Sequence, residues 1–326
     1  MKVLSYRHRR AFTSVLLIAL LSAMTPLGTP TVALGALGPV ENAAAKAAAW
    51  LPSKIEADGG FGNGFSKGSD LGVTADAVLA LADAGKAISS VKSKAGKSPL
   101  DYFAQSLRSR KPLNAGQYAK MVLALKLTGL NPRAFRGSDL VAALNKTYNP
   151  TTGVIGDSVF VHCLGMLALS RTSSNVPAKA ITKLETLQTK AGGWAFVGDA
   201  AADVDTTALC AEALLASSGP KRPDSVARAI RYLHTVQNID GGFPYQTPSK
   251  FGTESNANST ALVAQLIIAS GGQPESWAVT KGNPLSALVR LQQHSGAIAY
   301  QASAPDENTL ATAGAIPALS RKAFGA

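Results

Sequence analysis

Two acidic residues, Asp203 and Asp205, precede the most regular apolar helix that the sequence predicts, a run rich in alanine and leucine that extends to Ala216. Carboxylates at a helix start accept hydrogen bonds from its free backbone N–H groups, so capping alone accounts for both residues. The same carboxylates, with Thr206 beside them, are also placed to contact a ligand at the end of the helix. The residues themselves leave both interpretations open.

Other polar residues stand at the starts of other predicted helices. If these starts meet at one mouth, a ligand would bind there and the polar side chains would contact it. The candidate ligand-binding residues are Asp203, Asp205, Thr206, Asn256, Asn258, Tyr118, His162, Trp194 and Tyr245, together with Gln117, Asp157 and Glu254. Each of them has a helix cap or a packed core position as its alternative role.

The cysteines and histidines predict no metal site. His162 and Cys163 are neighbours, but adjacent residues of a helix point about 100° apart and rarely share one ion. Cys163 and Cys210 are the only cysteines, and they lie equally far from the ends of two predicted helices in neighbouring repeats. The sequence permits a disulfide between them and permits free thiols equally well.

A repeat organises the chain, and about six copies follow one another at a spacing of roughly 42 to 53 residues. Each copy joins an outer helix that carries Lys and Arg, a glycine-containing turn and an apolar inner helix. An inner helix that is apolar on nearly all sides must be buried on all sides. The predicted inner helices are 74–84, 117–128, 159–170, 203–216, 259–269 and 310–319, and the predicted outer helices are one ending at residue 50, 102–108, 140–148, 178–187, 226–236 and 285–292. Alternating inner and outer helices predict an all-α fold, an α/α toroid of about six helix pairs, as a single domain over residues 37–326.

The turns carry the pattern Gln-x-x-x-Gly-x-aromatic, which stands at Gln188–Trp194 and Gln237–Phe243, with a weaker copy at Gln292–Ile298. In this pattern the chain resembles the terpene cyclase and protein prenyltransferase superfamily of squalene cyclase type, over nearly the whole of residues 37–326. The resemblance implies the α/α toroid fold.

The segment from Asp203 to Thr206 also resembles the acidic motif of class II terpene cyclases, whose middle aspartate protonates an alkene or epoxide. The resemblance assigns this role to Asp205. Such an acid is kept protonated by a second group and an apolar site. The last aspartate of the motif is Thr206 here, and aromatic residues make up only 6% of the chain. Both departures weigh against a catalytic acid.

The last third of the chain looks closest to cobalamin carriers and their bacterial, transcobalamin-like relatives. The similar segments are Val204–Thr206, Asn256–Ala261 with Gln265 and Leu266 further along the same predicted helix, and Ala311–Leu319. This resemblance implies cobalamin or another corrinoid as a ligand, in contact with Asp205, Asn256 and Asn258. A glutamine of the carriers falls on Gly314, and the sequence after Leu319 is too short for the β-domain that covers the ligand in the carriers.

The first 36 residues have the pattern of a secretory signal peptide, with a basic start, a short apolar run and small residues before Ala33 and Ala36. The apolar run is short for a membrane span, which favours a cleaved signal peptide over the alternative of an uncleaved N-terminal anchor, and no second long apolar run follows. We therefore expect a secreted or cell-surface protein, a monomer without a transmembrane segment after cleavage.

Basic residues gather between residues 86 and 146, where twelve Lys and Arg face only Asp101 and Asp139. The formal charge of the whole chain is +12. This segment is either an ordinary solvated helix surface or a face for an anionic cell-envelope component. No nucleic-acid-binding motif accompanies the charge.

Together these patterns predict an exported, non-catalytic toroid that binds a small hydrophobic or corrinoid-like ligand at the mouth of the ring. The first alternative is a terpenoid cyclase-like enzyme with Asp205 as proton donor. The second is a cell-envelope interaction protein that uses the basic face 86–146.

Overall fold

The computed structural model describes residues 37–326, except for residues 65, 199, 218–223 and 251. The predicted signal peptide, residues 1–36, lies outside the described residues. None of the helices in the described part combines the length and the apolar composition that spanning a membrane requires.

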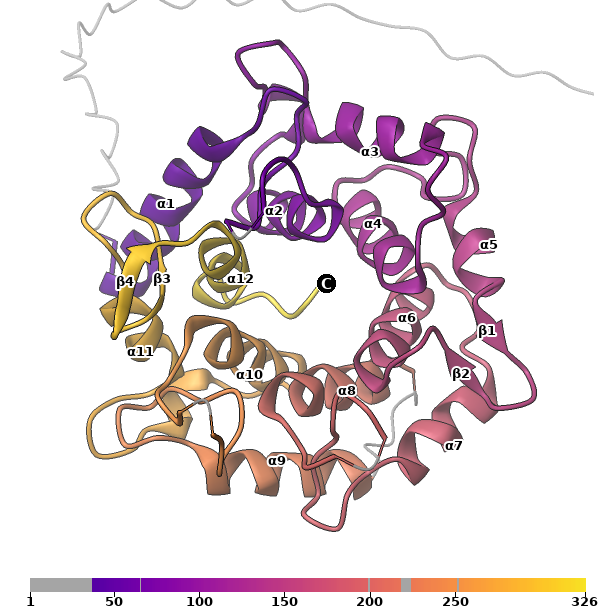
Figure 1. The fold of residues 1–326 in the computed structure, drawn as a ribbon. Helices are drawn as coiled ribbons and strands as arrows, with labels where there is room; N and C mark the ends of the chain where they lie inside the picture. Colours follow the sequence, from indigo (N-terminus) through magenta and orange to yellow (C-terminus); the bar gives the residue numbers. More distant parts are fainter. Residues whose placement is uncertain (1–36, 65, 199, 218–223, 251) are drawn as a thin grey trace, which may run out of the picture. The chain divides into compact units, whose positions relative to one another are not determined.

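Two concentric rings of helices make up the described domain (Figure 1). The inner ring consists of α2 (Leu71–Asp83), α4 (Ala115–Leu127), α6 (Val159–Arg171), α8 (Val204–Ser217), α10 (Ala257–Ala269) and α12 (Thr309–Leu319). The outer ring consists of α1 (Pro39–Trp50), α3 (Pro99–Arg108), α5 (Leu140–Asn145), α7 (Ala178–Thr186), α9 (Asp224–Val236) and α11 (Pro284–Arg290). The predicted all-α toroid is confirmed, and the helix ends differ from the predicted ones by only a few residues.

Short irregular elements connect the two rings. Strands β1 (Tyr148–Asn149) and β2 (Val154–Ile155) form one antiparallel hairpin, and β3 (Ala299–Gln301) and β4 (Ala304–Glu307) form another. Three 3₁₀ helices cover Leu51–Lys54, Ile88–Ser90 and Pro274–Trp277. Each inner helix packs against the next one, and α12 packs against α2, which closes the inner ring.

Every inner helix begins directly after a capping residue. The side chains of these residues each accept a hydrogen bond from the backbone N–H three positions on, and they are Asp70, Asn114, Ser158, Asp203, Asn256 and Asn308. Such caps satisfy N–H groups that have no partner within the helix. Equivalent positions on the six inner helices can therefore be found by counting residues from the cap.

The Gln-x-x-x-Gly-x-aromatic turn fastens an outer helix to the following inner helix. Trp194 donates its backbone N–H to Thr207 Oγ1 at 2.9 Å and its indole N–H to the Leu184 carbonyl at 2.8 Å. Gly192 has a φ of 95°, and a Cβ on it would lie 2.8 Å from the Arg228 carbonyl oxygen, so only glycine fits. Gln188 Nε2 donates to the carbonyls of Gly192 and Ser225, which ties the turn to α9.

A disulfide joins two neighbouring inner helices. Cys163 of α6 and Cys210 of α8 are bonded, with their Cα atoms 4.9 Å apart, and both are fully buried. Of the two alternatives that the sequence left open, the structure has the disulfide.

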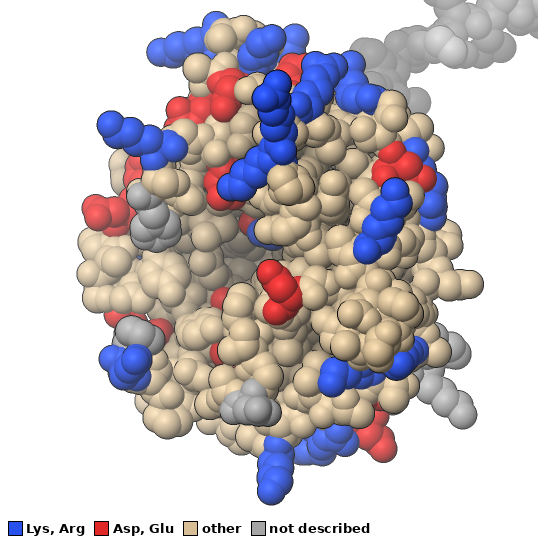
Figure 2. Space-filling model, turned by 45° about the vertical axis from the view of Figure 1, so that its right-hand side comes forward, with Lys and Arg blue, Asp and Glu red and all other residues tan. Residues whose placement is uncertain are grey.

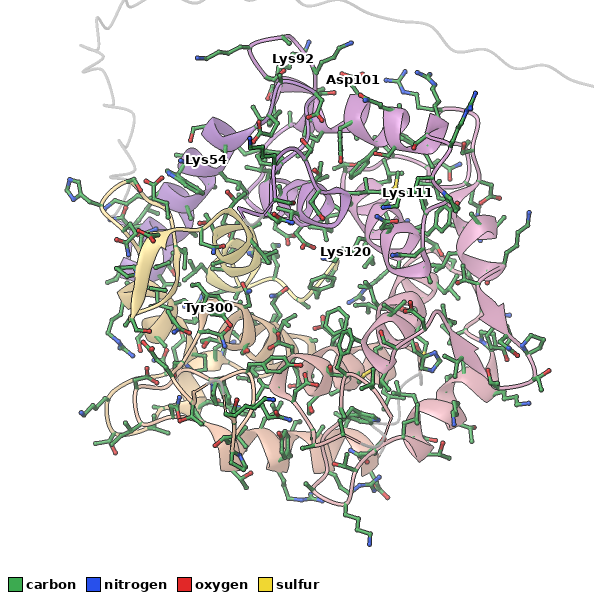
Figure 3. All side chains as sticks on the ribbon, in the orientation of Figure 1. Lys54, Lys92, Asp101, Lys111, Lys120 and Tyr300 are labelled. Carbon is green, nitrogen blue, oxygen red and sulfur yellow. A yellow bond between two sulfur atoms is a disulfide. The ribbon has the colours of Figure 1, made fainter. Side chains whose placement is uncertain are left out.

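Eleven of the twelve basic residues of 86–146 are exposed, and Lys120 is half-buried. Figure 2 shows a hollow in the middle of one face, with acidic side chains around it and Lys and Arg mostly toward the periphery. Lys120 is the exception, because it points to the middle of the ring while Lys92 lies at the outer edge (Figure 3). Lys120 thus belongs to the interior and not to the predicted basic face.

Candidate functional site

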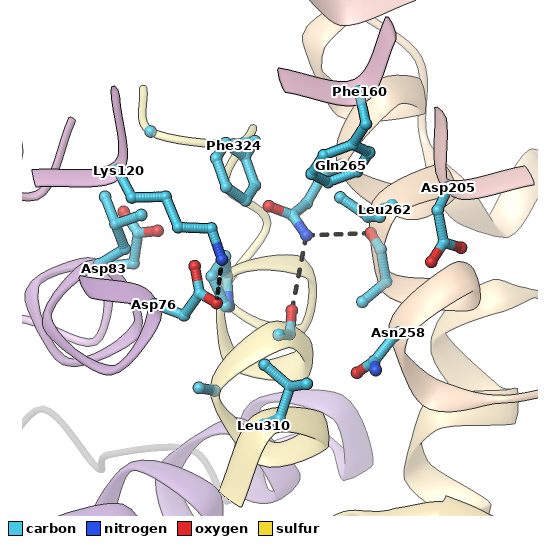
Figure 4. A pocket seen from close by; sticks show the side chains of 16 residues that line it. Asp76, Asp83, Lys120, Phe160, Asp205, Asn258, Leu262, Gln265, Leu310 and Phe324 are labelled. Atoms are coloured by element: carbon cyan, nitrogen blue, oxygen red, sulfur yellow. Dashed lines mark hydrogen bonds and ion pairs between the residues drawn. The ribbon is translucent and has the colours of Figure 1, made fainter. Parts of the chain in front are cut away.

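A cavity of about 200 Å³ lies inside the inner ring, and we call it the lumen (Figure 4). Side chains at two, five, six, nine and thirteen positions after the six caps form its walls. These distances follow one face of an α-helix. The lining residues are Asp76, Leu79, Asp83, Lys120, Phe160, Asp205, Asn258, Ala261, Leu262, Gln265, Leu310, Ala313, Gly314 and Pro317, with Phe324 and Gly325 from the end of the described chain.

Asp205, two positions after the cap of α8, borders the lumen. The Ser259 hydroxyl donates a hydrogen bond to its Oδ1 at 2.5 Å, and Asn256 Nδ2 donates to Ser259 Oγ at 3.0 Å. Burial raises the pKa of Asp205 to about 7; the Ser259 hydrogen bond opposes this shift and the nearby Asp203 adds to it. Asp205 is therefore a carboxyl that exchanges its proton near neutral pH.

Asp203 is also buried, but unlike Asp205 it does not border the lumen, although only one residue separates the two. It is 1% exposed, and its oxygens accept hydrogen bonds from the backbone N–H groups of Thr206 at 2.7 Å and Phe196 at 2.8 Å. Burial raises its pKa, and these hydrogen bonds counteract part of the shift. The two interpretations of this acidic pair are thus divided between its members: Asp203 caps α8, and Asp205 borders the cavity.

An ion pair lies on the other side of the lumen from Asp205 (Figure 4). Lys120 Nζ of α4 is 2.6 Å from Asp76 Oδ2 of α2. Asp76 Oδ1 and the Oδ2 of nearby Asp83 are buried and have no hydrogen-bond partner among the described residues. Burial raises the pKa of Asp83 to about 7, against the opposing charge of Lys322.

Residues 321–326, which we call the closing segment, run into the middle of the ring after α12 (Figure 1). Phe324 and Gly325 border the lumen, and the Phe324 N–H donates to Glu212 Oε1 of α8 at 2.7 Å. A Cβ on Gly325 would lie 2.9 Å from Leu123 Cδ2, so the backbone fits closely against α4.

The remaining predicted residues fall into two groups. Asn258 borders the lumen, as Asp205 does. Asn256 is the cap of α10 and does not border the lumen. The backbone carbonyl of Tyr245 accepts a hydrogen bond from the Val204 N–H at the start of α8. Burial and the nearby carboxyls of Asp203 and Asp205 raise the pKa of Tyr245 to about 12. These three residues therefore surround the helix start that carries Asp205.

The second group does not line the lumen. His162 is fully buried, accepts from Ile155 N–H at Nδ1 and bonds the Ala180 carbonyl at Nε2, and burial lowers its pKa. Trp194 is buried within the turn that precedes α8. Thr206 is buried, and its Oγ1 has no hydrogen-bond partner among the described residues. Tyr118 packs against the core. Of the further candidates, Gln117 accepts from the backbone N–H of the cap Asn114 and so completes the capping box of α4, and Asp157 and Glu254 are exposed.

Asp76, Lys120 and Gln265 form a wall that the sequence did not predict: Asp76 was not singled out, Lys120 was expected on the basic face, and Gln265 was noted only in the resemblance to the cobalamin carriers. A signal for it exists, because charged and amide side chains interrupt otherwise apolar helices at equal distances from their caps. Asp76 and Lys120 both stand six positions after a cap, and Glu212 and Gln265 both stand nine positions after one.

Neither a metal centre nor a corrinoid fits the lumen well. No three His, Cys, Asp or Glu side chains in the described ranges are arranged to hold a metal ion. A cavity of about 150 Å³ holds a benzene-sized ligand, so a lumen of about 200 Å³ holds roughly ten non-hydrogen atoms. A corrinoid is far larger and would have to bind outside the lumen.

Residues 140–305, just over half of the chain, match the model of the squalene-hopene cyclase C-terminal domain. The chain belongs to this family. Drimenyl diphosphate synthase of Streptantibioticus cattleyicolor is 30% identical over 244 residues, which cover 65% of this chain and 44% of the relative. The chain thus spans less than half the length of this curated relative.

Solved structures share the toroid of this squalene-hopene cyclase-type domain. The type II terpene cyclase MstE from Scytonema, in complex with geranylgeranyl dihydroxybenzoate, has a TM-score of 0.65 at 17% identity, over 87% of this chain and 97% of that one. A protein from Actinoplanes has a TM-score of 0.63 at 15% identity, over 86% and 99%. A glycosidase in complex with glucose has a TM-score of 0.56 at 14% identity, over 86% and 96%. At these identities the likeness concerns the fold alone.

The family match divides the lumen into two parts. It includes α6, α8 and α10, which carry Phe160, Asp205, Asn258 and Gln265, whereas α2 and α4 with the Asp76–Lys120 pair lie outside residues 140–305.

Proposed function

We propose that this squalene-hopene cyclase-type domain protonates and cyclises an isoprenoid in its lumen, with Asp205 as the acid. The observation that carries the proposal is that Asp205, and not Asp203, borders the cavity, with its pKa raised to about 7. An ordinary aspartic acid is almost fully ionised at neutral pH, whereas Asp205 retains its proton in a large fraction of molecules.

The proposed reaction is an isomerisation. Asp205 transfers its proton to one carbon of a C=C bond, which leaves a carbocation on the other carbon and a carboxylate on Asp205. The π electrons of a second C=C bond in the same chain attack the cation and close a ring. Loss of a proton from a neighbouring carbon forms a new C=C bond, and this proton returns to the Asp205 carboxylate directly or through water.

The surroundings of Asp205 suit this step. The Ser259 hydrogen bond to Asp205, supported by Asn256, favours the carboxylate that proton transfer leaves behind and so strengthens the acid. The rings of Phe160 and Phe324 on the lumen wall stabilise a nearby positive charge, and Leu262 and Leu310 supply apolar contact. The names of MstE, a type II terpene cyclase, and of the drimenyl diphosphate synthase support the same class of reaction.

The test is incubation of the protein with linear isoprenols and isoprenyl diphosphates of ten to twenty carbons, followed by mass spectrometry for cyclic isomers. Asp205→Asn should abolish the products, while Asp157→Asn, which changes an exposed carboxyl, should leave them unchanged. Equal product from the Asp205→Asn variant would contradict the assignment.

A second candidate function is binding without turnover. Thr206 stands where the resemblance expects a further carboxyl, so α8 presents a single acidic group to the lumen. In this case native mass spectrometry would find an unchanged isoprenoid in the lumen, and Asp205→Asn would alter affinity but release no product.

We also propose that the protein is exported. The signal-peptide pattern of residues 1–36 supports export, and so does a disulfide between two buried cysteines, since disulfides persist in oxidising compartments. Fractionation of the host with an antibody tests this proposal, and a purely cytoplasmic signal would contradict it.

A further inference from the structure

The lumen wall on the far side from Asp205 holds polar atoms that the proposed proton transfer does not use. Asp76 Oδ1 and Gln265 Oε1 are buried acceptors with no partner among the described residues. Lys120 Nζ has Asp76 Oδ2, at 2.6 Å, as its hydrogen-bond partner in the described part of the chain, so N–H groups of the ammonium remain available. We call Asp76, Lys120 and Gln265 the polar wall.

Gln265 is held in place for this role. Its side chain is 1% exposed, and its Nε2 donates to the carbonyls of Ala261 at 3.2 Å and Gly314 at 3.5 Å. These bonds leave the amide oxygen, which is turned toward the side of the lumen where Lys120 and Asp76 lie (Figure 4). A buried acceptor without a partner destabilises the folded protein, because it has lost its hydrogen bonds to water. A ligand that donates to this oxygen removes that destabilisation.

The charges around the polar wall select against an ionic head group. Lys120 is already paired with Asp76, and Asp83 and Asp205, whose pKa values burial raises to about 7, are each ionised in only about half of the molecules at pH 7, so the lumen offers a phosphate or carboxylate no net positive charge. An ammonium group would meet the ammonium of Lys120 at the same wall. A hydroxyl group suits both partners, because it accepts from Lys120 and donates to Gln265 Oε1 or Asp76 Oδ1.

We propose that the polar wall of Asp76, Lys120 and Gln265 binds the hydroxyl of an isoprenoid alcohol, and that the lumen discriminates against the corresponding diphosphate. The inference rests on the proposed function only in that both place an isoprenoid in the lumen. The lumen of about 200 Å³ fits an isoprenol of about ten carbons.

The experiment is calorimetric titration of the full chain at pH 7 with four probes that share one carbon skeleton: geraniol, geranyl diphosphate, geranylamine and the hydrocarbon without the hydroxyl. Geraniol should bind at least tenfold more tightly than each of the others. Gln265→Leu and Lys120→Met should each reduce the preference for geraniol over the hydrocarbon to less than threefold. Asp157→Asn, which changes an exposed carboxyl outside the lumen, should retain the preference.

The outcomes separate the two proposals. Equal affinity for geraniol and the hydrocarbon, or tighter binding of the diphosphate, overturns the polar wall and leaves the cyclase proposal standing. An intact polar-wall preference without any cyclic product overturns the cyclase proposal alone. Binding of none of the four probes overturns the polar wall, and circular dichroism of each variant identifies a loss of affinity that is due to unfolding. Should Gln265→Leu fail to fold, Gln265→Met, which also removes the amide oxygen, replaces it, and an unchanged preference in that variant also overturns the polar wall.

Discussion

Phe324 donates its backbone N–H to Glu212 Oε1 at 2.7 Å, and this contact attaches the closing segment 321–326 to the inner helix α8. It also fixes a carboxyl in the core, since Glu212 is 1% exposed and its Oε2 has no partner among the described residues. Burial raises the pKa of Glu212 to about 8, while the Phe324 N–H and the charge of Arg171 lower it. The closing segment and the ionisation of the core are therefore coupled.

Replacement of Glu212 by glutamine should stabilise the protein at alkaline pH. The folded pKa of about 8 lies above the ordinary value of 4.5, so the folded state binds more protons than the unfolded state between these limits. The stability that protonated Glu212 contributes is complete below pH 4.5 and is lost as the pH rises through about 8, by at most roughly 4–5 kcal/mol. Glu212→Gln keeps an acceptor for Phe324, so its melting temperature should exceed the wild-type value at pH 9 and equal it at pH 5.

Thermal melts of the wild type and the variant from pH 5 to 9 measure this difference. A parallel shift of the melting temperature at every pH would contradict the prediction, and Asp157→Asn is the control.

Truncation of Phe324 should lengthen the space available to a ligand. The ring borders the lumen at the closing segment, so Phe324→Ala removes wall volume without touching Asp205 or the polar wall. The affinity for a fifteen-carbon isoprenol, relative to that for a ten-carbon isoprenol, should rise by about tenfold in the variant. Burial of a few additional methylene groups of the longer chain accounts for a change of this size. Titration with farnesol and geraniol measures the ratio. Val197→Ala, at an exposed position, is the matched control, and an unchanged ratio in Phe324→Ala would show that the ring does not limit the lumen.

The helices of the toroid could be predicted from the sequence because each has a local signal. The caps Asp203 and Asn256 stand directly before apolar runs, and Gly192 marks a turn that no other residue permits. These signals depend on neighbouring residues alone. A cap precedes every inner helix, and a turn glycine with positive φ precedes every inner helix except α4.

The lumen could be predicted only in part. Asp205 and Asn258 stand at helix starts and border the lumen, but His162, which is also in the first turn of its helix, lies in the core, as does Trp194 in the turn before α8. Which side of each helix start faces the lumen depends on how all six inner helices pack together, and residues throughout the ring determine this packing. Lys120 was assigned to the basic surface because its charge was counted along the chain, whereas its place six positions after a cap puts it inside.

The contact of Phe324 with Glu212 could not be foreseen at all. It joins residues 112 positions apart, and the closing segment has neither helical periodicity nor a turn motif to announce it. Its position follows from the shape of the opening that the other helices leave.

Removal of the disulfide should destabilise the toroid without changing its helix content. Cys163 and Cys210 close a loop with a sequence separation of 47, for which chain entropy predicts a stabilisation of about 3–4 kcal/mol. The double variant Cys163→Ala and Cys210→Ala should lower the free energy of unfolding in urea by about this amount. Added dithiothreitol should lower the stability of the wild type and leave that of the variant unchanged. An identical urea midpoint for the oxidised wild type and the variant would contradict the prediction.

Loss of the Ser259 hydroxyl should shift the pH dependence of any reaction at Asp205. The hydroxyl donates to Asp205 Oδ1 and lowers the pKa of this carboxyl, against the larger effect of burial. In Ser259→Ala the pKa rises above about 7, so the protonated form persists to higher pH, while the acid itself becomes weaker. The pH at which product formation is half-maximal should therefore rise by about one unit. The maximal rate at low pH should fall by about tenfold, because a weakening of the acid by one pKa unit corresponds to about 1.4 kcal/mol. Rates measured from pH 5 to 9 give both values. A fall in rate without a change in the half-maximal pH would show that Ser259 only positions the helix, and Ser303→Ala, at an exposed position that bonds Glu254, is the control.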